Sequence, residues 1–338
     1  MRRVAMAMML VAAGPLGAQR AAGDTLVPIR EWTVPYGEKA RPRDPMVAPD
    51  GRVWFVGQEG NYVARLDPAS GTFERFAIDS GTHPHNVIVD AKGDAWYAGN
   101  RNGMIGRIDG RTGAITRFVM PDSAVRDPHT LVLDGRGKLW FTAQFSNHVG
   151  VLDIATGKIR LWKSPVERSR PYGIVIAANG QPWFNLFGTN ALGTIDPRTM
   201  TLRTVTLPDA RARGRRIALT KDGRVWYVDY ARGFLGVHDP RDGSVREFAM
   251  PGGAQSLPYA MATDDRDRLW FVETGRQPNR FVGFDPATQR FFGMTPVASG
   301  GTIRHMTWDA TRRTLWFGTD VNTIGRADVS RVDPRIVQ

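Results

Sequence analysis

Three histidines have the same sequence spacing to a following tryptophan, although the three tryptophans are far apart in the chain. Each comes eleven residues before a tryptophan, and together they are His85, His129 and His305. Imidazole suits general acid–base catalysis because its unperturbed pKa, roughly 6.5, lies near neutrality. If the fold gathers these positions at one place, their side chains can transfer protons there, and we predict them as catalytic residues.

The same position before three further tryptophans carries hydroxyl or guanidinium groups. The residues are Tyr172, Arg215 and Tyr259, and Arg216 directly follows Arg215. Tyrosine rings and guanidinium groups suit stacking and the recognition of anions, so we predict all of these as substrate-binding residues. The corresponding segment of the first repeat, residues 43–46, does not align unambiguously.

A second position, three residues after the tryptophan, is acidic in part of the chain. Asp229 and Glu273 occupy it directly, and Asp320 lies one residue beyond it. Carboxylate oxygens are the ligands that Mg²⁺ and Ca²⁺ prefer. The alternative is that these acids pair with arginines on the same face of the protein.

The tryptophans that define these positions recur with a nearly constant period. A period in the forties indicates repeated supersecondary units, here one four-stranded blade each. Short apolar runs such as 131–133 and 139–142 are bounded by turn residues, and no stretch of helical length has a helical apolar period. We predict an all-β fold, a seven-bladed β-propeller over residues 25–331, followed by a tail at 332–338. The gaps are 42, 44, 43, 43, 44 and 46 residues between Trp54, Trp96, Trp140, Trp183, Trp226, Trp270 and Trp316.

The two ends of the repeat array predict how the ring closes. The seventh repeat ends near residues 324–328 and has no outer strand of its own. Residues 29–35 resemble the outer strands at 115–121 and 245–251. We therefore predict that residues 29–35 complete the last blade, which would remove two open sheet edges.

The first 18 residues differ from the repeats. Arg2 and Arg3 precede an apolar stretch at 4–13 and a plausible cleavage site at 16–18, a pattern typical of a signal peptide. We expect the mature protein to be periplasmic or secreted, with no stable membrane span. The chain has no cysteine, which excludes disulfides, thiolate metal sites and thiol nucleophiles.

The chain is basic, with a formal net charge of +12. Its arginines are spread over all the repeats, whereas a nucleic-acid site would concentrate them on one face. We therefore expect no nucleic-acid partner. The expected partner is a small-molecule or peptide-like ligand at the central channel, and we expect a monomer because a closed ring leaves no sheet edge to protect.

Several sequence motifs of the repeats resemble those of the virginiamycin B lyase (streptogramin lyase) family. They are the residues 84–90, 105–109 and 140–143, and the resemblance extends over all seven repeats. It implies a seven-bladed propeller that opens a cyclic depsipeptide at its ester by elimination, without water and with Mg²⁺.

The resemblance also implies a set of site residues. His85 and the sequence Asp127-Pro128-His129 match two of its parts, with His129 as acid/base and Asp127 as metal ligand. A third part, a glutamate three residues after the tryptophan of the same repeat, is replaced by Ala143. Glu273 has that local position in another repeat, so Asp127 and Glu273 are the candidate ligands for Mg²⁺, or for Ca²⁺ as the alternative.

Three functions follow as hypotheses. The first is a lyase-like enzyme in which histidine removes a proton α to a carbonyl and the ester oxygen leaves. The second is a non-catalytic, exported propeller that binds a ligand such as an anionic sugar, a peptide or a cell-wall fragment. The third is a metal-dependent lactonase.

Overall fold

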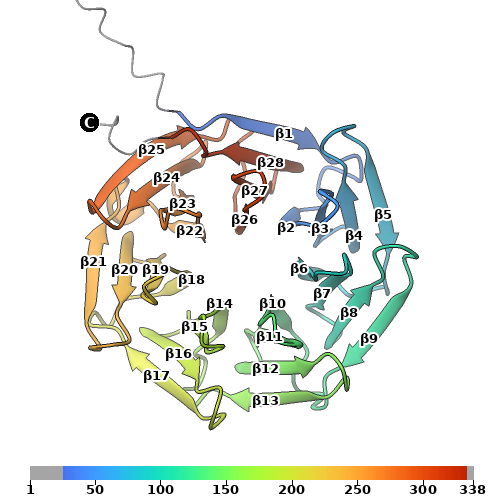
Figure 1. Cartoon of the computed structure of the whole chain (residues 1–338), viewed down its shortest axis with the longest axis horizontal. Coiled ribbons are helices and arrows are strands. Elements are labelled where there is room, and N and C mark those ends of the chain that lie inside the picture. Colours follow the sequence, from blue (N-terminus) through green and yellow to red (C-terminus); the bar gives the residue numbers. More distant parts are fainter. Residues whose placement is uncertain (1–25, 333–338) are drawn as a thin grey trace, which may run out of the picture.

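The computed structural model describes residues 26–332, which form a closed ring of seven four-stranded antiparallel sheets (Figure 1). Within these residues the helical segment is the 3₁₀ turn Gly253–Gln255, and no helix is long and apolar enough to cross a membrane. The predicted all-β, seven-bladed propeller is therefore confirmed. The predicted signal peptide (1–18) and residues 333–338 of the predicted tail lie outside the described residues.

Each blade has its first strand at the central channel and its last strand at the rim (Figure 1). Blades are numbered here in chain order. The innermost strands, from blade one to blade seven, are β2 (Pro42–Val47), β6 (Pro84–Val89), β10 (Pro128–Leu133), β14 (Pro171–Ile176), β18 (Gly214–Leu219), β22 (Pro258–Thr263) and β26 (Met306–Asp309). The second strands are β3 (Val53–Gly57), β7 (Ala95–Gly99), β11 (Lys138–Ala143), β15 (Pro182–Leu186), β19 (Val225–Asp229), β23 (Leu269–Glu273) and β27 (Thr314–Thr319).

The outer half of each blade is built in the same way. The third strands are β4 (Tyr62–Leu66), β8 (Met104–Ile108), β12 (His148–Asp153), β16 (Ala191–Ile195), β20 (Phe234–His238), β24 (Arg280–Asp285) and β28 (Thr323–Asp328). The rim strands are β5 (Phe73–Ala77), β9 (Ile115–Val119), β13 (Ile159–Lys163), β17 (Leu202–Thr206), β21 (Val245–Ala249), β25 (Arg290–Pro296) and, for blade seven, β1 (Ile29–Thr33).

The repeated tryptophans form the contacts between neighbouring blades. Trp96 of blade two is fully buried and packs in one cluster with Leu139 and Phe141 of blade three. Trp226 of blade five does the same with Phe271 of blade six. Each large ring buries apolar area where one blade covers the next, which explains why the tryptophan recurs once per blade.

The first strand closes the ring as predicted. β1 pairs with β28 in antiparallel register from Ile29↔Ala327 to Thr33↔Thr323 (Figure 1). Trp32 of β1 stacks on Trp316 with ring centroids 5.4 Å apart. The pairing completes the four-stranded sheet of blade seven, and the closed ring then fixes where the innermost strands converge.

Candidate functional site

An extra residue near the start of the innermost strand recurs in six of the seven blades. In β6, Pro84 pairs with Gly99 and Val87 pairs with Tyr97, so β6 has one more residue than β7 over this stretch. A β-bulge of this kind re-aims side chains and is common beside active sites. The predicted residues that lie within bulged segments are His85, His129, Tyr172, Arg215 and Tyr259.

The bulged segments bring the predicted aromatic residues into one row across the channel. His85 and His129 stack with ring centroids 3.5 Å apart, and the ring of Tyr172 lies 4.2 Å from that of His129. The hydroxyl groups of Tyr172 and Tyr259 are hydrogen-bonded to each other. Side chains from blades two, three, four and six therefore meet at one place, while their roles stay predictions.

The hydrogen bonds at Nδ1 of the two histidines bear on which ring nitrogen carries the hydrogen. His85 Nδ1 lies 3.1 Å from the carbonyl oxygen of His129, which can only accept, so Nδ1 carries the hydrogen and Nε2 keeps its lone pair. His129 Nδ1 lies 2.9 Å from Thr130 Oγ1. Thr130 Oγ1 also accepts a hydrogen bond from Arg216 Nη1 at 3.2 Å. Because a hydroxyl oxygen has two lone pairs and one hydrogen, this arrangement fits either neutral tautomer of His129.

Burial keeps the three predicted catalytic histidines neutral. It lowers the pKa of His85 and of His129 well below the usual value, and the positive charges of Arg43 and Arg216 lower both further. Burial likewise lowers the pKa of His305 to about 4, although Asp44 opposes the shift. His305 Nδ1 has no hydrogen-bond partner among residues 26–332. All three rings are therefore uncharged at neutral pH.

Arg215 lies among aromatic rings instead of beside an acid. Its guanidinium carbon is 3.7 Å from the ring centroid of Tyr259, 4.2 Å from that of Tyr230 and 4.9 Å from that of Phe187. Within the described part of the chain no carboxylate forms an ion pair with it, and its Nε has no hydrogen-bond acceptor. Aromatic faces stabilise this cation but leave its donors open to an anionic ligand.

Sequence reasoning missed a buried pair in blade one. Arg43 Nε donates to Asp44 Oδ1 at 2.9 Å, and Asn86 donates to Asp44 Oδ2 at 2.9 Å. Arg216 Nη2 lies 3.6 Å from the same Oδ2. Arg43 stands eleven residues before Trp54, so the spacing that found the histidines would also have found it. Two buried guanidinium groups therefore share a single carboxylate.

These arginines also change the acidity of their neighbours. Burial would raise the pKa of Asp44, but the charges of Arg43 and Arg216 outweigh it and hold the pKa well below its usual range. Burial would likewise raise the pKa of Tyr172, and here Arg215, Arg216 and Arg43 lower it to about 8. The pKa of Tyr259 is raised, by burial first and then by the adjacent Tyr172. The neighbouring arginines therefore favour ionisation of Tyr172, and the charge of Tyr172 in turn raises the pKa of Tyr259.

The family of the chain follows from its match to known proteins. A family model described as the virginiamycin B lyase family matches residues 27–327. The chain belongs to this family. No curated protein matches the chain at a significant level.

The virginiamycin B lyase fold is also shared with solved structures. A streptogramin B lyase structure gives a TM-score of 0.79 at 22% identity, covering 89% of this chain and 97% of that one. Virginiamycin B lyase from Staphylococcus aureus gives 0.81 at 21%, covering 90% and 99%. The extracellular domain of a hybrid two-component system from B. thetaiotaomicron gives 0.69 at 17%, covering 88% and 42%. At these identities the likeness shows the fold alone.

The metal implied by the virginiamycin B lyase family finds no matching donor set here. Asp127 accepts hydrogen bonds from the backbone N–H groups of Phe145 and Ser146 and from Ser146 Oγ. Glu273 accepts from Gly252 N at 2.7 Å and from Arg280 Nε at 2.8 Å. Within residues 26–332 no group of three or more His, Asp or Glu side chains is placed to share a metal ion. Asp127 and Glu273 instead hold separate loops, on blades three and six, and no Mg²⁺ or Ca²⁺ step is assigned to them.

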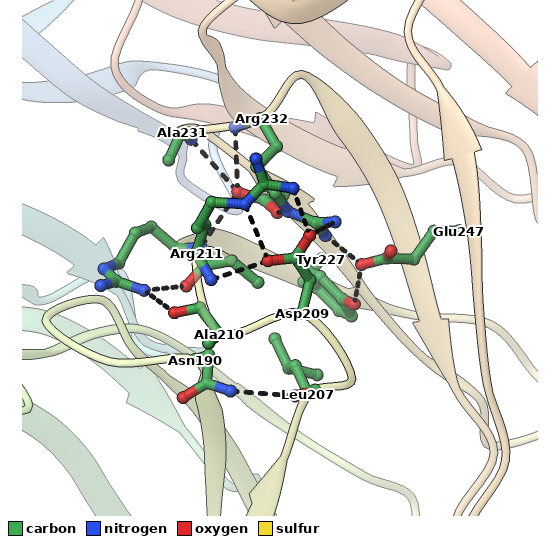
Figure 2. Close-up of polar contacts among 12 residues, drawn as sticks. Asn190, Leu207, Asp209, Ala210, Arg211, Tyr227, Ala231, Arg232 and Glu247 are labelled. Atoms are coloured by element: carbon green, nitrogen blue, oxygen red, sulfur yellow. Dashed lines mark hydrogen bonds and ion pairs between the residues drawn. The ribbon is translucent and has the colours of Figure 1, made fainter.

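The remaining acids of the predicted second position pair with arginines. Arg232 in blade five forms ion pairs with Asp209, Asp229 and Glu247, with an Nη1–Oδ2 distance of 3.1 Å to Asp209. Figure 2 shows Arg232 together with Asp209 and Glu247. Asp320 pairs with Arg304 at 2.7 Å. Together with the Glu273–Arg280 pair, these contacts bear out the alternative that the acids neutralise arginines.

Proposed function

We propose that this member of the virginiamycin B lyase family opens a cyclic ester of the depsipeptide type by elimination. The observation that supports the proposal is the stacked pair of neutral imidazoles, His85 and His129, whose centroids are 3.5 Å apart. His85 Nε2 has a lone pair that can accept a proton, and we assign the hydrogen of His129 to Nε2, where it can be donated in a hydrogen bond to the leaving oxygen.

In the proposed step, His85 Nε2 takes the proton from the carbon α to a carbonyl. The electron pair of that C–H bond forms a carbon–carbon double bond to the β carbon, and the bond from the β carbon to the ester oxygen breaks. The carboxylate leaves as an anion, to which His129 Nε2–H donates a hydrogen bond, and His85 keeps the proton that it removed until it passes to water. Arg215 and Arg216 stabilise the negative charge that develops on the carbonyl oxygen.

A solved relative supports a role for histidine. A catalytically inactive histidine-to-alanine variant of virginiamycin B lyase from Staphylococcus aureus has been solved with quinupristin, at 21% identity to this chain and a TM-score of 0.80. That protein therefore depends on a histidine for activity, and we transfer the requirement to His85 and His129 as part of the proposal.

The test is the mass of the product. Incubation with quinupristin and a panel of smaller cyclic esters is expected to give a ring-opened product of unchanged mass, because elimination consumes no water. His85→Ala and His129→Ala are each expected to lower kcat by about 100-fold or more while the KM changes little.

His238→Gln serves as the matched control. His238 is also a buried histidine, but it packs against Trp183 in the body of the propeller, with ring centroids 5.4 Å apart. Its replacement should leave kcat within about twofold, and thermal unfolding would show that each variant is folded. A product that carries one added water would contradict elimination and favour lactone hydrolysis.

A second function, ligand binding without turnover, is favoured by Arg215. Its guanidinium lies 3.7 Å from the Tyr259 ring centroid and is available to an anion. Tight binding of the panel with no ring opening would support this function and contradict the lyase. The hypothesis of a metal-dependent lactonase lacks a carboxylate-rich donor set within residues 26–332.

Export remains part of the proposal. It rests on the pattern of residues 1–18, and one protein of similar fold is an extracellular domain.

A further inference from the structure

The central channel contains a cavity of about 460 Å³ that touches the innermost strands of all seven blades. Its walls are mainly apolar, and many of the side chains that line it are only half-buried. They include Met46, Leu133, Ile176, Leu219 and Trp308. The stacked His85 and His129 are not among the lining residues. The cavity therefore adjoins the proposed elimination site and shares Arg216 with it.

Aliphatic walls are a poor environment for ordered water. A buried water needs two to four polar partners, and a cavity lined by methyl and methylene groups offers few of them. Ligand cavities of roughly 300–1,000 Å³ with apolar walls and a few polar groups are instead typical of small-molecule sites. The apolar lining includes successive residues of several innermost strands, so it extends along the channel. A wall that extends in one direction fits an unbranched hydrocarbon chain.

One end of the cavity is cationic. Arg216, Thr130 and His305 line it there, and Arg216 is only 2% exposed. Arg216 Nε donates to the Arg304 carbonyl oxygen at 3.1 Å and Nη1 donates to Thr130 Oγ1 at 3.2 Å. Its Nη2 has no hydrogen-bond acceptor among the described residues.

The neighbouring carboxylate does not satisfy this donor. Asp44 Oδ2 is 3.6 Å from Arg216 Nη2, beyond a hydrogen bond, and Asp44 already accepts from Arg43 and Asn86. The guanidinium groups of Arg43 and Arg216 thus outnumber the single carboxylate, since His305 is neutral. A buried charge without full pairing is costly, so an anion at this end of the cavity would be stabilised.

We propose that the channel binds a medium-chain aliphatic carboxylate. The carboxylate lies beside the Arg216 guanidinium, and the hydrocarbon chain lies between Leu133, Ile176 and Leu219. The site combines one charged head position with a long apolar wall, which selects for a ligand having both.

The first experiment is calorimetric titration of the full-length protein with hexanoate, octanoate, decanoate and uncharged decanol. Affinity is expected to rise about two- to fourfold with each added methylene, because each buries apolar surface in the channel. Decanol is expected to bind at least about tenfold more weakly than decanoate, because its uncharged hydroxyl group cannot form an ion pair with Arg216. Equal affinity across the acids, or equal affinity of decanol and decanoate, would overturn the proposal.

A pair of variants tests the location. Leu219→Glu places a carboxylate in the apolar wall and is expected to weaken decanoate binding at least about tenfold. Val119→Glu adds the same charge on the rim strand β9, where Val119 is 71% exposed, and is the matched control. Unchanged decanoate affinity in Leu219→Glu, with both proteins folded by thermal unfolding, would remove the channel as the site.

Discussion

Two sets of charged side chains in this propeller differ in how fully they are paired. In the first set, called here the paired set, each acid has an arginine partner. The pairs are Asp229–Arg232, Glu273–Arg280 and Asp320–Arg304. At the channel, Arg43 and Arg216 share one carboxylate, and Arg215 has only aromatic rings. Charges that are already paired stabilise loops, whereas charges with open donors can bind a ligand. We therefore propose that ligand binding depends on the channel set and that the paired set contributes stability.

The largest effect is expected for Asp44→Asn. Loss of this carboxylate leaves Arg43 and Arg216 buried without a counter-charge, so the free energy of unfolding should fall by about 3–5 kcal/mol. The same change adds one net positive charge beside the cavity, so decanoate should bind about tenfold more tightly. Urea unfolding and calorimetric titration measure the two quantities. A variant that loses stability and gains no affinity would break the distinction between the two sets.

A smaller effect is expected for Glu273→Gln. The change removes the charge that pairs with Arg280, whose side chain is 17% exposed and can reach water. The free energy of unfolding should fall by about 2 kcal/mol, while decanoate affinity and kcat stay within about twofold. Urea unfolding, titration and turnover are compared with the wild type. A large loss of activity without loss of stability would instead assign Glu273 to the reaction.

The smallest effect is the response of anion binding to pH. Burial opposes ionisation of Tyr172, but the neighbouring arginines lower its pKa to about 8. As pH rises through this value, the tyrosinate neutralises part of the positive charge near Arg216. Decanoate should therefore bind a few-fold more weakly above pH 8 than at pH 7. Titration at several pH values measures the change, and Tyr172→Phe should abolish it. An identical pH profile in the variant would assign the change to another group.

Part of the site could be predicted because it repeats with the blade. The position eleven residues before each tryptophan located His85, His129 and Tyr172, and the same spacing applies to Arg43. The β-bulges in which these residues lie could not be predicted. A bulge depends on how two strands pair, and the residues in it differ from blade to blade.

The metal prediction shows the limit of the same reasoning. Asp127 and Glu273 have suitable chemistry, but each is engaged by its own loop or arginine partner. The sequence shows which residues are acidic, but it does not show which hydrogen-bond donors lie beside their carboxylates in the folded protein.

The sequence alone determined the all-β propeller, its seven blades and the closure by residues 29–35. These features depend on a local period and on one strand that resembles the rim strands, so they can be read along the chain. Only the tertiary structure decided the stacking of His85 on His129, the shared carboxylate of Asp44 and the apolar cavity. Each of these joins side chains from different blades, and their distances and balance of charge exist only once the ring has closed.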